Sequence, residues 1–224
     1  MSSGLESLWY ARHQVPGDPG YVLVGVASEQ FDDGMVVELP PPAARPTGWV
    51  LELHLAGLDQ VPHRVLLADW AVPGAPVLWY VVLPAPGTAS EVDLVAFSTP
   101  DRAEGDVLDA AGFQALGIDW SNQVGAMRWD VATGLVRQVY VAPAFRRRGV
   151  ATKVGWVAAC VAGGRGWAPL QVDGRRTDLG EAWISGRRDG WRTHVPERTG
   201  WSPPMTPPDE AAGVPERNLM PDAP

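Results

Sequence analysis

One stretch of this 224-residue chain brings together the residue types that bind phosphate groups. It runs from Val139 to Thr152 and reads Val-Tyr-Val-Ala-Pro-Ala-Phe-Arg-Arg-Arg-Gly-Val-Ala-Thr. Pro143 stops a strand, three arginines make a short basic loop, and Gly149 lets the backbone turn into a helix. The pattern therefore predicts a strand, a basic loop and a helix in direct succession.

The start of that helix suits a diphosphate. The first N–H groups of a helix have no internal partner and carry partial positive charge. A diphosphate placed there accepts several of these N–H bonds, while Arg146, Arg147 and Arg148 neutralise it. Ala151 has almost no side chain, so a phosphate can approach closely. The alternative is a basic strand-to-helix turn that holds no ligand.

This segment resembles the pyrophosphate loop of the GNAT superfamily of acyl-CoA-dependent N-acetyltransferases. The family pattern is Gln/Arg-x-x-Gly-x-Gly/Ala, and the chain has Arg146-x-x-Gly149-x-Ala151. The approach strand, the aromatic Phe145 and the following helix stand in the family's order, and the resemblance covers residues 123–191. It implies acetyl-CoA as co-substrate and no metal. The cofactor-binding residues that it implies are Val139, Tyr140, Val141, Arg146, Arg147, Arg148, Gly149, Val150, Ala151 and Thr152.

The resemblance also implies a V-shaped opening beside the strand that ends at Val141, where a bulge parts two parallel neighbours. Backbone groups of Val139 and Val141 would bond the pantetheine arm, and an exposed amide would polarise the thioester carbonyl. Such a donor contributes about 2.7–4 kcal/mol in comparable sites. The acceptor amine would attack directly, so no Ser or Cys nucleophile is needed, and Cys160 is expected to be inert packing.

The chain departs from the family downstream of this loop. The last family motif reads Asn-x-x-Ala-x-x-Leu-Tyr-x-x-x-Gly-Phe, and aligning it on Ala182 places Leu179 at the Asn position and Gly186 at the Tyr position. Both polar groups are absent, and Ser185 is a poor substitute because its hydroxyl pKa is high. Asp130 or Asp173 could act as a general base through water, although each also fits an ordinary strand or turn carboxylate.

Two functions remain open. The first is an N-acetyltransferase that moves an acetyl group from acetyl-CoA to an unidentified amine acceptor. The second is a GNAT-like module that has lost its chemistry and serves as a structural or interaction subunit of a larger assembly, such as a virion. The absent Asn and Tyr equivalents, the extra strands and the Pro-rich tail motivate the second.

The elements that position these residues can be read from the same pattern. Short Val-, Leu- and Trp-rich segments separated by Pro, Gly, Asp and Asn predict antiparallel strands in the first hundred residues. These segments are Tyr21–Ala27, Met35–Leu39, Trp49–Leu55, Arg64–Val72, Val77–Leu83 and Val92–Phe97. The first predicted helix is Asp106–Leu116.

A hairpin and a second helix are predicted to follow. Gln123–Val131 and Leu135–Val141 flank a three-residue turn with Gly134 at its end. The apolar stripe of Val150, Val154, Val157 and Val161 predicts a helix over Val150–Ala162 that packs on a sheet. Further on, Leu170–Val172 reads as a short strand, and Asp178 with Glu181 resembles a helix capping box.

We therefore expect an α/β (α+β) protein with a mixed, largely antiparallel sheet. Its expected parts are a β-rich N-terminal region (1–105), a GNAT-like acyl-CoA-binding region (106–195) and a Pro-rich tail (196–224). Eight of the last 29 residues are proline, so the tail is expected to be disordered or docked on a protein partner. Trp191 and Trp201 could contribute to such a docking surface, and the alternative is ordinary packing.

Composition excludes several classes of protein. The chain has 46% apolar and 20% charged residues and a formal net charge of −8, and no apolar run is long enough to cross a membrane. Residues 1–136 hold 5 basic and 17 acidic side chains, so nucleic acid would be repelled. One cysteine, no signal peptide and no metal-ligand spacing among the four histidines point to a cytoplasmic protein.

Overall fold

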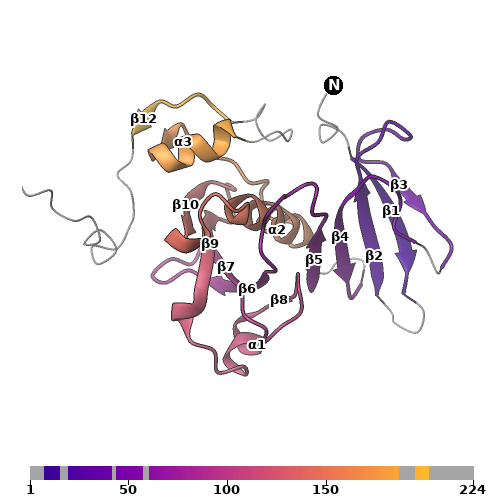
Figure 1. The fold of residues 1–224 in the computed structure, drawn as a ribbon, viewed down its shortest axis with the longest axis horizontal. Helices are drawn as coiled ribbons and strands as arrows, with labels where there is room; N and C mark the ends of the chain where they lie inside the picture. The colour runs from indigo at the N-terminus through magenta and orange to yellow at the C-terminus, as the bar shows by residue number, and fades with distance from the viewer. Residues whose placement is uncertain (1–7, 16–19, 42–43, 58–60, 187–194, 202–224) are drawn as a thin grey trace, which may run out of the picture.

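A computed structural model describes residues 8–15, 20–41, 44–57, 61–186 and 195–201 of the chain. Figure 1 shows two sheets with a helix between them and a smaller helical unit beside the second sheet. Most of the strand pairs are antiparallel. The expectation of an α+β protein with largely antiparallel pairing is therefore confirmed, although the strands form two main sheets.

The first sheet has the strand order β3-β1-β2-β4-β5. Its strands are β1 (Trp9–Gln14), β2 (Tyr21–Val26), β3 (Val36–Glu38), β4 (Trp49–Leu55) and β5 (Arg64–Leu67). The sequence prediction omitted β1, which pairs antiparallel with β2 and parallel with β3. In β1, Trp9 and Ala11 are buried and Tyr10 and Arg12 less so, which is the alternation of a strand with one covered face.

The second sheet has the order β10-β9-β7-β6-β8. Its strands are β6 (Trp79–Pro84), β7 (Glu91–Phe97), β8 (Val107–Leu108), β9 (Gln123–Asp130) and β10 (Val136–Val141). Because β7 pairs with both β6 and β9, the sheets divide the chain between β5 and β6. The sequence division at residue 105 instead cuts through the second sheet.

The predicted helix Asp106–Leu116 is wrong in its first part. Val107 and Leu108 form β8, which lies parallel to β6, and α1 covers only Ala110–Gln114. The side chain of Asp109 accepts a hydrogen bond from the N–H of Gly112 at 2.8 Å, so the carboxylate caps the helix at that point.

The long helix α2 (Val150–Gly164) packs on the second sheet through its apolar stripe, as predicted, and it also packs on the first sheet, which was not predicted. Val150, Val154, Val157 and Val161 join a buried cluster with Met127 and Trp129 of β9. On its other side, Trp156 and Cys160 pack against residues of the first sheet. Burial raises the pKa of the Cys160 thiol to about 12, so this residue is unreactive packing, as expected.

Beyond α2 the chain forms a small unit of β11 (Arg175–Arg176), α3 (Asp178–Ser185) and β12 (Gly200–Trp201). The N-cap of α3 is Thr177, whose Oγ1 accepts from the N–H of Gly180 at 3.0 Å. The capping box read from Asp178 and Glu181 was therefore one residue late, and Glu181 instead pairs with Arg176 at 2.8 Å. Leu170–Val172 makes only an isolated bridge, at Gln171.

No helix within the described ranges has the length and hydropathy needed to cross a bilayer. The prolines from residue 203 onward, Trp191 and His194 lie outside the described residues, so the proposed tail surface has no structural description.

Candidate functional site

The site begins at the β9–β10 hairpin, because its second strand forms one edge of the sheet. The pairing of β10 with β9 shifts register between Val136 and Gln138, which places a bulge at Arg137. From there to Val141, no other strand of the described chain pairs with β10.

The free edge of β10 has a definite set of outward-facing groups. Hydrogen-bonded residues alternate along an antiparallel ladder. Ala142 donates its N–H to Val124 at 3.0 Å, so the bonds to β9 fall on Tyr140 and Gln138. The backbone groups of Val139 and Val141 therefore point away from β9, toward the open edge.

The start of β10 does have a parallel neighbour. The N–H of Val136 donates to Gln171 at 2.8 Å, and the N–H of Gln171 donates to Gly134 at 2.9 Å. After Gln171 the chain turns away toward β11, where Asp173 accepts a bond from the N–H of Arg175. The two parallel segments are thus joined at one end and separate at the bulge.

The basic loop connects β10 to α2 through two residues in the left-handed region. Pro143–Phe145 make one turn of 3-10 helix, after which Arg147 has a φ of 59° and Gly149 a φ of 74°. A Cβ on Gly149 would lie 3.2 Å from Cβ of Ala75, so glycine meets both a backbone and a packing requirement here.

The three arginines of the loop contact a carbonyl and an aromatic ring but no carboxylate among the described residues. Arg147 and Arg148 are exposed, and Nε of Arg146 donates to the carbonyl of Val141 at 3.1 Å. The guanidinium of Arg148 lies 5.5 Å from the ring centre of Phe145. Within the described ranges no carboxylate pairs with these three side chains, so their positive charge is uncompensated locally.

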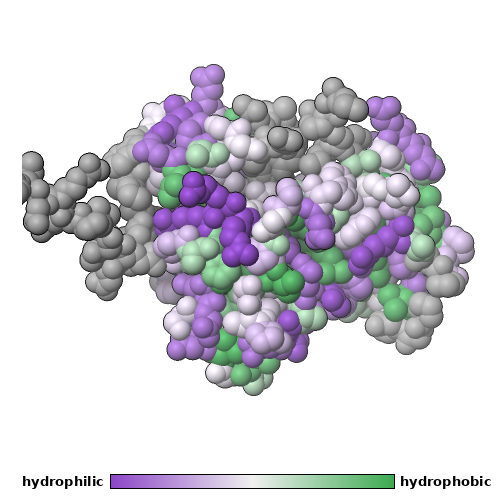
Figure 2. Space-filling view, in the orientation of Figure 1, coloured by the Kyte–Doolittle hydropathy of each residue, from purple (hydrophilic) through white to green (hydrophobic). Residues whose placement is uncertain are grey.

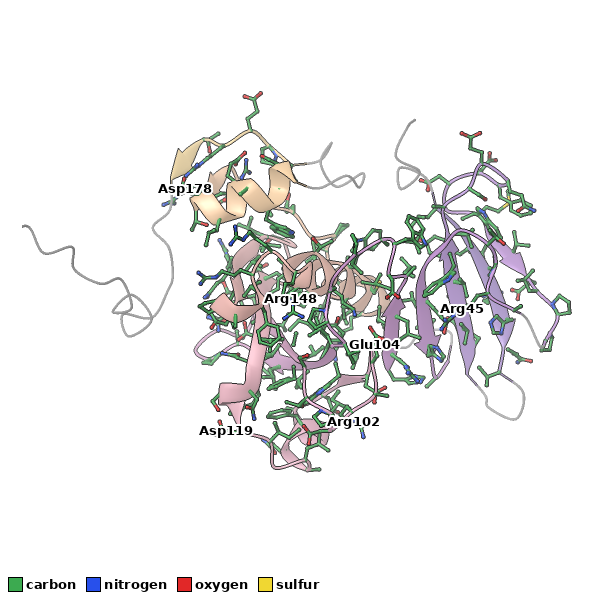
Figure 3. The ribbon with its side chains drawn as sticks, in the orientation of Figure 1. Arg45, Arg102, Glu104, Asp119, Arg148 and Asp178 are labelled. Atoms are coloured by element: carbon green, nitrogen blue, oxygen red, sulfur yellow. The ribbon has the colours of Figure 1, made fainter. Side chains whose placement is uncertain are left out.

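Figure 3 labels Arg148 near the middle of the view, beside α2. In Figure 2, which has the same orientation, strongly hydrophilic side chains gather on the surface in this area. The basic loop is therefore accessible on this face.

The first turn of α2 supplies the backbone donors. Lys153 makes the first helical bond, to the carbonyl of Gly149 at 2.9 Å, and Gly149 provides no side-chain cap. In the described part of the chain, the N–H groups of Val150, Ala151 and Thr152 have no acceptor. A diphosphate could bind there only if these N–H groups were free of internal hydrogen bonds, and among the described residues they are.

Gly125 allows α2 to lie close to the hairpin. It is the register partner of Val141 on β9, and a Cβ placed on it would come within 2.9 Å of Cγ1 of Val150. This close approach brings the first turn of α2, the basic loop and the open edge of β10 to one place. The ten expected cofactor-binding residues are thus all found around the β10–α2 connection.

Sequence reasoning missed what Lys153 does. The basic residue nearest to the arginine run is buried, with 4% of its side chain exposed. Its Nζ donates to Glu104 at 2.5 Å and to the carbonyl of Pro76 at 3.0 Å. Lys153 therefore fastens α2 to two preceding connections and is not available to a ligand. Lys153 is the only lysine among 18 basic residues, and this was the one feature of the sequence that set it apart from the arginines.

The carboxylates offered as general bases do not join this group. Oδ1 of Asp130 accepts from the N–H groups of Ala132 and Thr133, at 3.1 and 2.8 Å, and from the hydroxyl of Thr133 at 2.9 Å. These bonds lower its pKa and fix it at the turn end of the hairpin, away from Val141. Asp173 is exposed at a turn and accepts from the N–H of Arg175 at 3.0 Å.

Trp183 of α3 reaches the first turn of α2. Nε1 of Trp183 donates to Oγ1 of Thr152 at 3.1 Å, and Trp183 packs against the same buried cluster as Val139 and Val141. Leu179 is exposed and Gly186 ends the helix, so α3 presents no acid at the two positions where the family has polar residues.

The other polar clusters lie elsewhere. Glu52 of β4 is buried and bonded to Arg45 and to His54, whose Nε2 lies 2.7 Å from its Oε1. Burial would raise the pKa of Glu52, but these two hydrogen bonds outweigh it and bring the pKa to about 2. No group of His, Cys, Asp and Glu able to hold a metal occurs among the described residues.

Comparison of the chain with protein-family models, with curated proteins and with solved structures finds no match to any of them.

Proposed function

We propose that this protein is an acyl-CoA-dependent N-acyltransferase, with acetyl-CoA as the acyl donor and an amine as acceptor. The observation that carries the proposal is the β10–α2 connection. Among the described residues, an open strand edge, three arginines without a carboxylate partner and a helix start whose N–H groups have no acceptor meet there. Each of the three suits a different part of one ligand.

The diphosphate would lie at the start of α2. The N–H groups of Val150, Ala151 and Thr152 donate to its oxygens, and Arg147 and Arg148 balance its charge. Arg146 is held by the carbonyl of Val141, so its guanidinium fixes the loop against the strand end while keeping further donors for the ligand.

The thioester arm would run along β10. The resemblance to GNAT enzymes implies a bulge that parts two parallel neighbours, and the register shift at Arg137 with the single bridge to Gln171 supports this arrangement. The outward N–H groups of Val139 and Val141 are then the donors for the pantetheine arm and the thioester carbonyl.

The reaction would proceed by direct attack. The acceptor nitrogen bonds to the thioester carbon, the sulfur leaves with the bonding pair as the thiolate of coenzyme A, and the amine loses a proton to water. Asp130 and Asp173 are both held in turns, so the proposed chemical step depends on the backbone donors and on the stability of the leaving thiolate.

Isothermal titration calorimetry with coenzyme A tests the binding half of the proposal. We expect the wild-type chain to bind, and the double variant Arg147→Ser/Arg148→Ser to bind about ten- to a hundredfold more weakly, because two charge-assisted contacts are lost. Arg165→Ser is the matched control, because Arg165 is exposed at the opposite end of α2. No heat of binding at millimolar coenzyme A would rule the proposal out.

A second candidate is a GNAT-like module without chemistry that serves as a subunit of a larger assembly. Two observations favour it. Leu179 of α3 and the C-cap Gly186 carry no polar side chain, and the carboxylate of Asp130 is hydrogen-bonded within its own turn. Release of free thiol from acetyl-CoA in the presence of a panel of amines separates the two. Binding without thiol release for any amine favours the subunit.

A further inference from the structure

The contact between α3 and the first turn of α2 includes a hydrogen bond between two side chains. Nε1 of Trp183 donates to Oγ1 of Thr152 at 3.1 Å, across 31 residues of sequence. Both side chains are half-buried, and the indole also packs against the buried cluster on which Val139 and Val141 pack. The bond therefore forms at the junction of α2, α3 and β10.

The direction of this bond determines what the hydroxyl of Thr152 can do. A threonine hydroxyl has one hydrogen to donate and two lone pairs to accept with, whereas an indole N–H only donates. The bond from Trp183 occupies a lone pair of Oγ1, so the hydrogen of the hydroxyl is left for another acceptor. Accepting one bond also polarises the hydroxyl and strengthens the bond that it donates.

Two kinds of acceptor at the helix start could take the hydrogen of the Thr152 hydroxyl. A threonine in a helix can donate to the carbonyl four residues earlier, which for Thr152 is that of Arg148, in the basic loop. A phosphate oxygen held by the N–H groups of Val150, Ala151 and Thr152 is a charged and stronger acceptor at the same place.

We propose that Trp183 is a positioning residue of the diphosphate site, which holds the hydroxyl of Thr152 as a donor to a phosphate oxygen. This inference rests on the proposed function. It gives α3 a part in the site although the helix has neither of the polar residues that the family carries there. The indole N–H of Trp183 bonds to Thr152, so the proposed effect on the diphosphate passes through Thr152.

A double-mutant cycle measured by calorimetry tests this. Trp183→Phe keeps an aromatic ring and removes the N–H, while Thr152→Val keeps the shape and removes the hydroxyl. We expect each to lower coenzyme A affinity about three- to tenfold, which is the worth of one hydrogen bond. The double variant should bind no more weakly than Thr152→Val alone, because Trp183 acts only through that hydroxyl. Thr152→Ser, which keeps the hydroxyl, should stay within about twofold of wild type.

Two controls separate positioning from general stability. Trp9→Phe loses a comparable indole bond, from Nε1 to the hydroxyl of Ser28 at 2.8 Å in the first sheet, and should leave affinity unchanged. Pantetheine, which has no diphosphate, should bind wild type and Trp183→Phe equally.

These measurements distinguish failure of the positioning role of Trp183 from failure of the proposed function. Additive losses in the cycle, an unchanged affinity of Trp183→Phe, or an equal loss for pantetheine would overturn the positioning role while leaving the function in place. If the wild-type chain does not bind coenzyme A, the proposed function and this inference both fall.

Discussion

Gly149 is the residue on which the shape of the basic loop depends. Its φ of 74° lies in the left-handed region, and the space beside its Cα is closed by Ala75 at 3.2 Å from a Cβ position. A side chain here must strain the backbone and displace the neighbouring loop, so the spacing between the arginines and the first turn of α2 would change.

We predict that Gly149→Ala lowers the free energy of unfolding by about 1–2 kcal/mol and weakens coenzyme A binding. Urea unfolding and calorimetry measure the two effects. Gly163→Ala is the matched control, since Gly163 lies in α2 with nothing within 4 Å of a Cβ, and alanine there should be neutral or stabilising. An unchanged affinity in Gly149→Ala would contradict the role given to the loop.

Glu52 gives a residue-scale prediction about pH. Its pKa is lowered from 4.5 to about 2 in the folded chain, so the folded state binds this proton less readily than the unfolded state. Its contribution to stability is present above pH 4.5 and is lost as the pH falls toward 2.

We expect the stability of wild type to fall through that acid range by up to about 3 kcal/mol more than the stability of Glu52→Gln. Urea titrations at several pH values measure the difference between the two proteins. Glu38→Gln, which alters a carboxylate with 62% of its side chain exposed, is the control and should follow wild type. Parallel curves for wild type and Glu52→Gln would contradict the prediction.

At the scale of elements, the open edge of β10 is the feature that the proposed chemistry needs. The N–H of Val139 faces away from β9, whereas Tyr140 takes part in the ladder with β9. Proline has no N–H and is tolerated in a strand only where that group is not bonded within the sheet.

Val139→Pro should therefore fold and lose most of its affinity for coenzyme A, while Tyr140→Pro should disrupt the sheet. Circular dichroism reports folding, and calorimetry reports binding. Full affinity in a folded Val139→Pro would show that the pantetheine arm does not use this edge.

Elements with strong local signals could be predicted from the sequence. The hairpin has a turn glycine at Gly134 and alternating strands, and α2 has four valines in one stripe, so both were predicted near their observed bounds. Val107–Leu108 was misread as helix because two residues carry no periodicity and the pairing with β6 is long-range. The division into two sheets depends on the pairing of β7 with β9, which no local pattern encodes.

The candidate site divides in the same way. The basic loop and the helix start are contiguous in sequence, so their order and the start of the helix could be predicted, whereas the 3-10 turn and the left-handed Arg147 were not. The contacts of Lys153 with Glu104 and of Trp183 with Thr152 join residues 49 and 31 positions apart, and only the fold brings them together.

At the scale of the whole molecule, Lys153 joins α2 to two segments that lie far from it in the sequence. Its buried ammonium holds Glu104 and the carbonyl of Pro76, which lie in the connections that flank β6 and β7. This buried ion pair, in which Glu104 remains 37% exposed, therefore adds a polar anchor to the apolar packing that holds α2.

We predict that Lys153→Met lowers the free energy of unfolding by about 1–3 kcal/mol, because the carbonyl of Pro76 loses its donor and Glu104 loses its partner. Arg102→Met is the control: it breaks an exposed pair with Asp106 and should cost less than about 1 kcal/mol. Equal costs in urea unfolding would contradict the anchoring role.

The central claim is that main-chain N–H groups at the start of α2 bind the diphosphate of coenzyme A. Amide NMR spectra recorded during a coenzyme A titration test it most directly, because each N–H is observed separately. We predict that the signals of Val150, Ala151 and Thr152 shift together and saturate, with the signal of Val139 following when the full thioester is used. Unshifted signals at those three residues, with or without shifts elsewhere, would contradict the account.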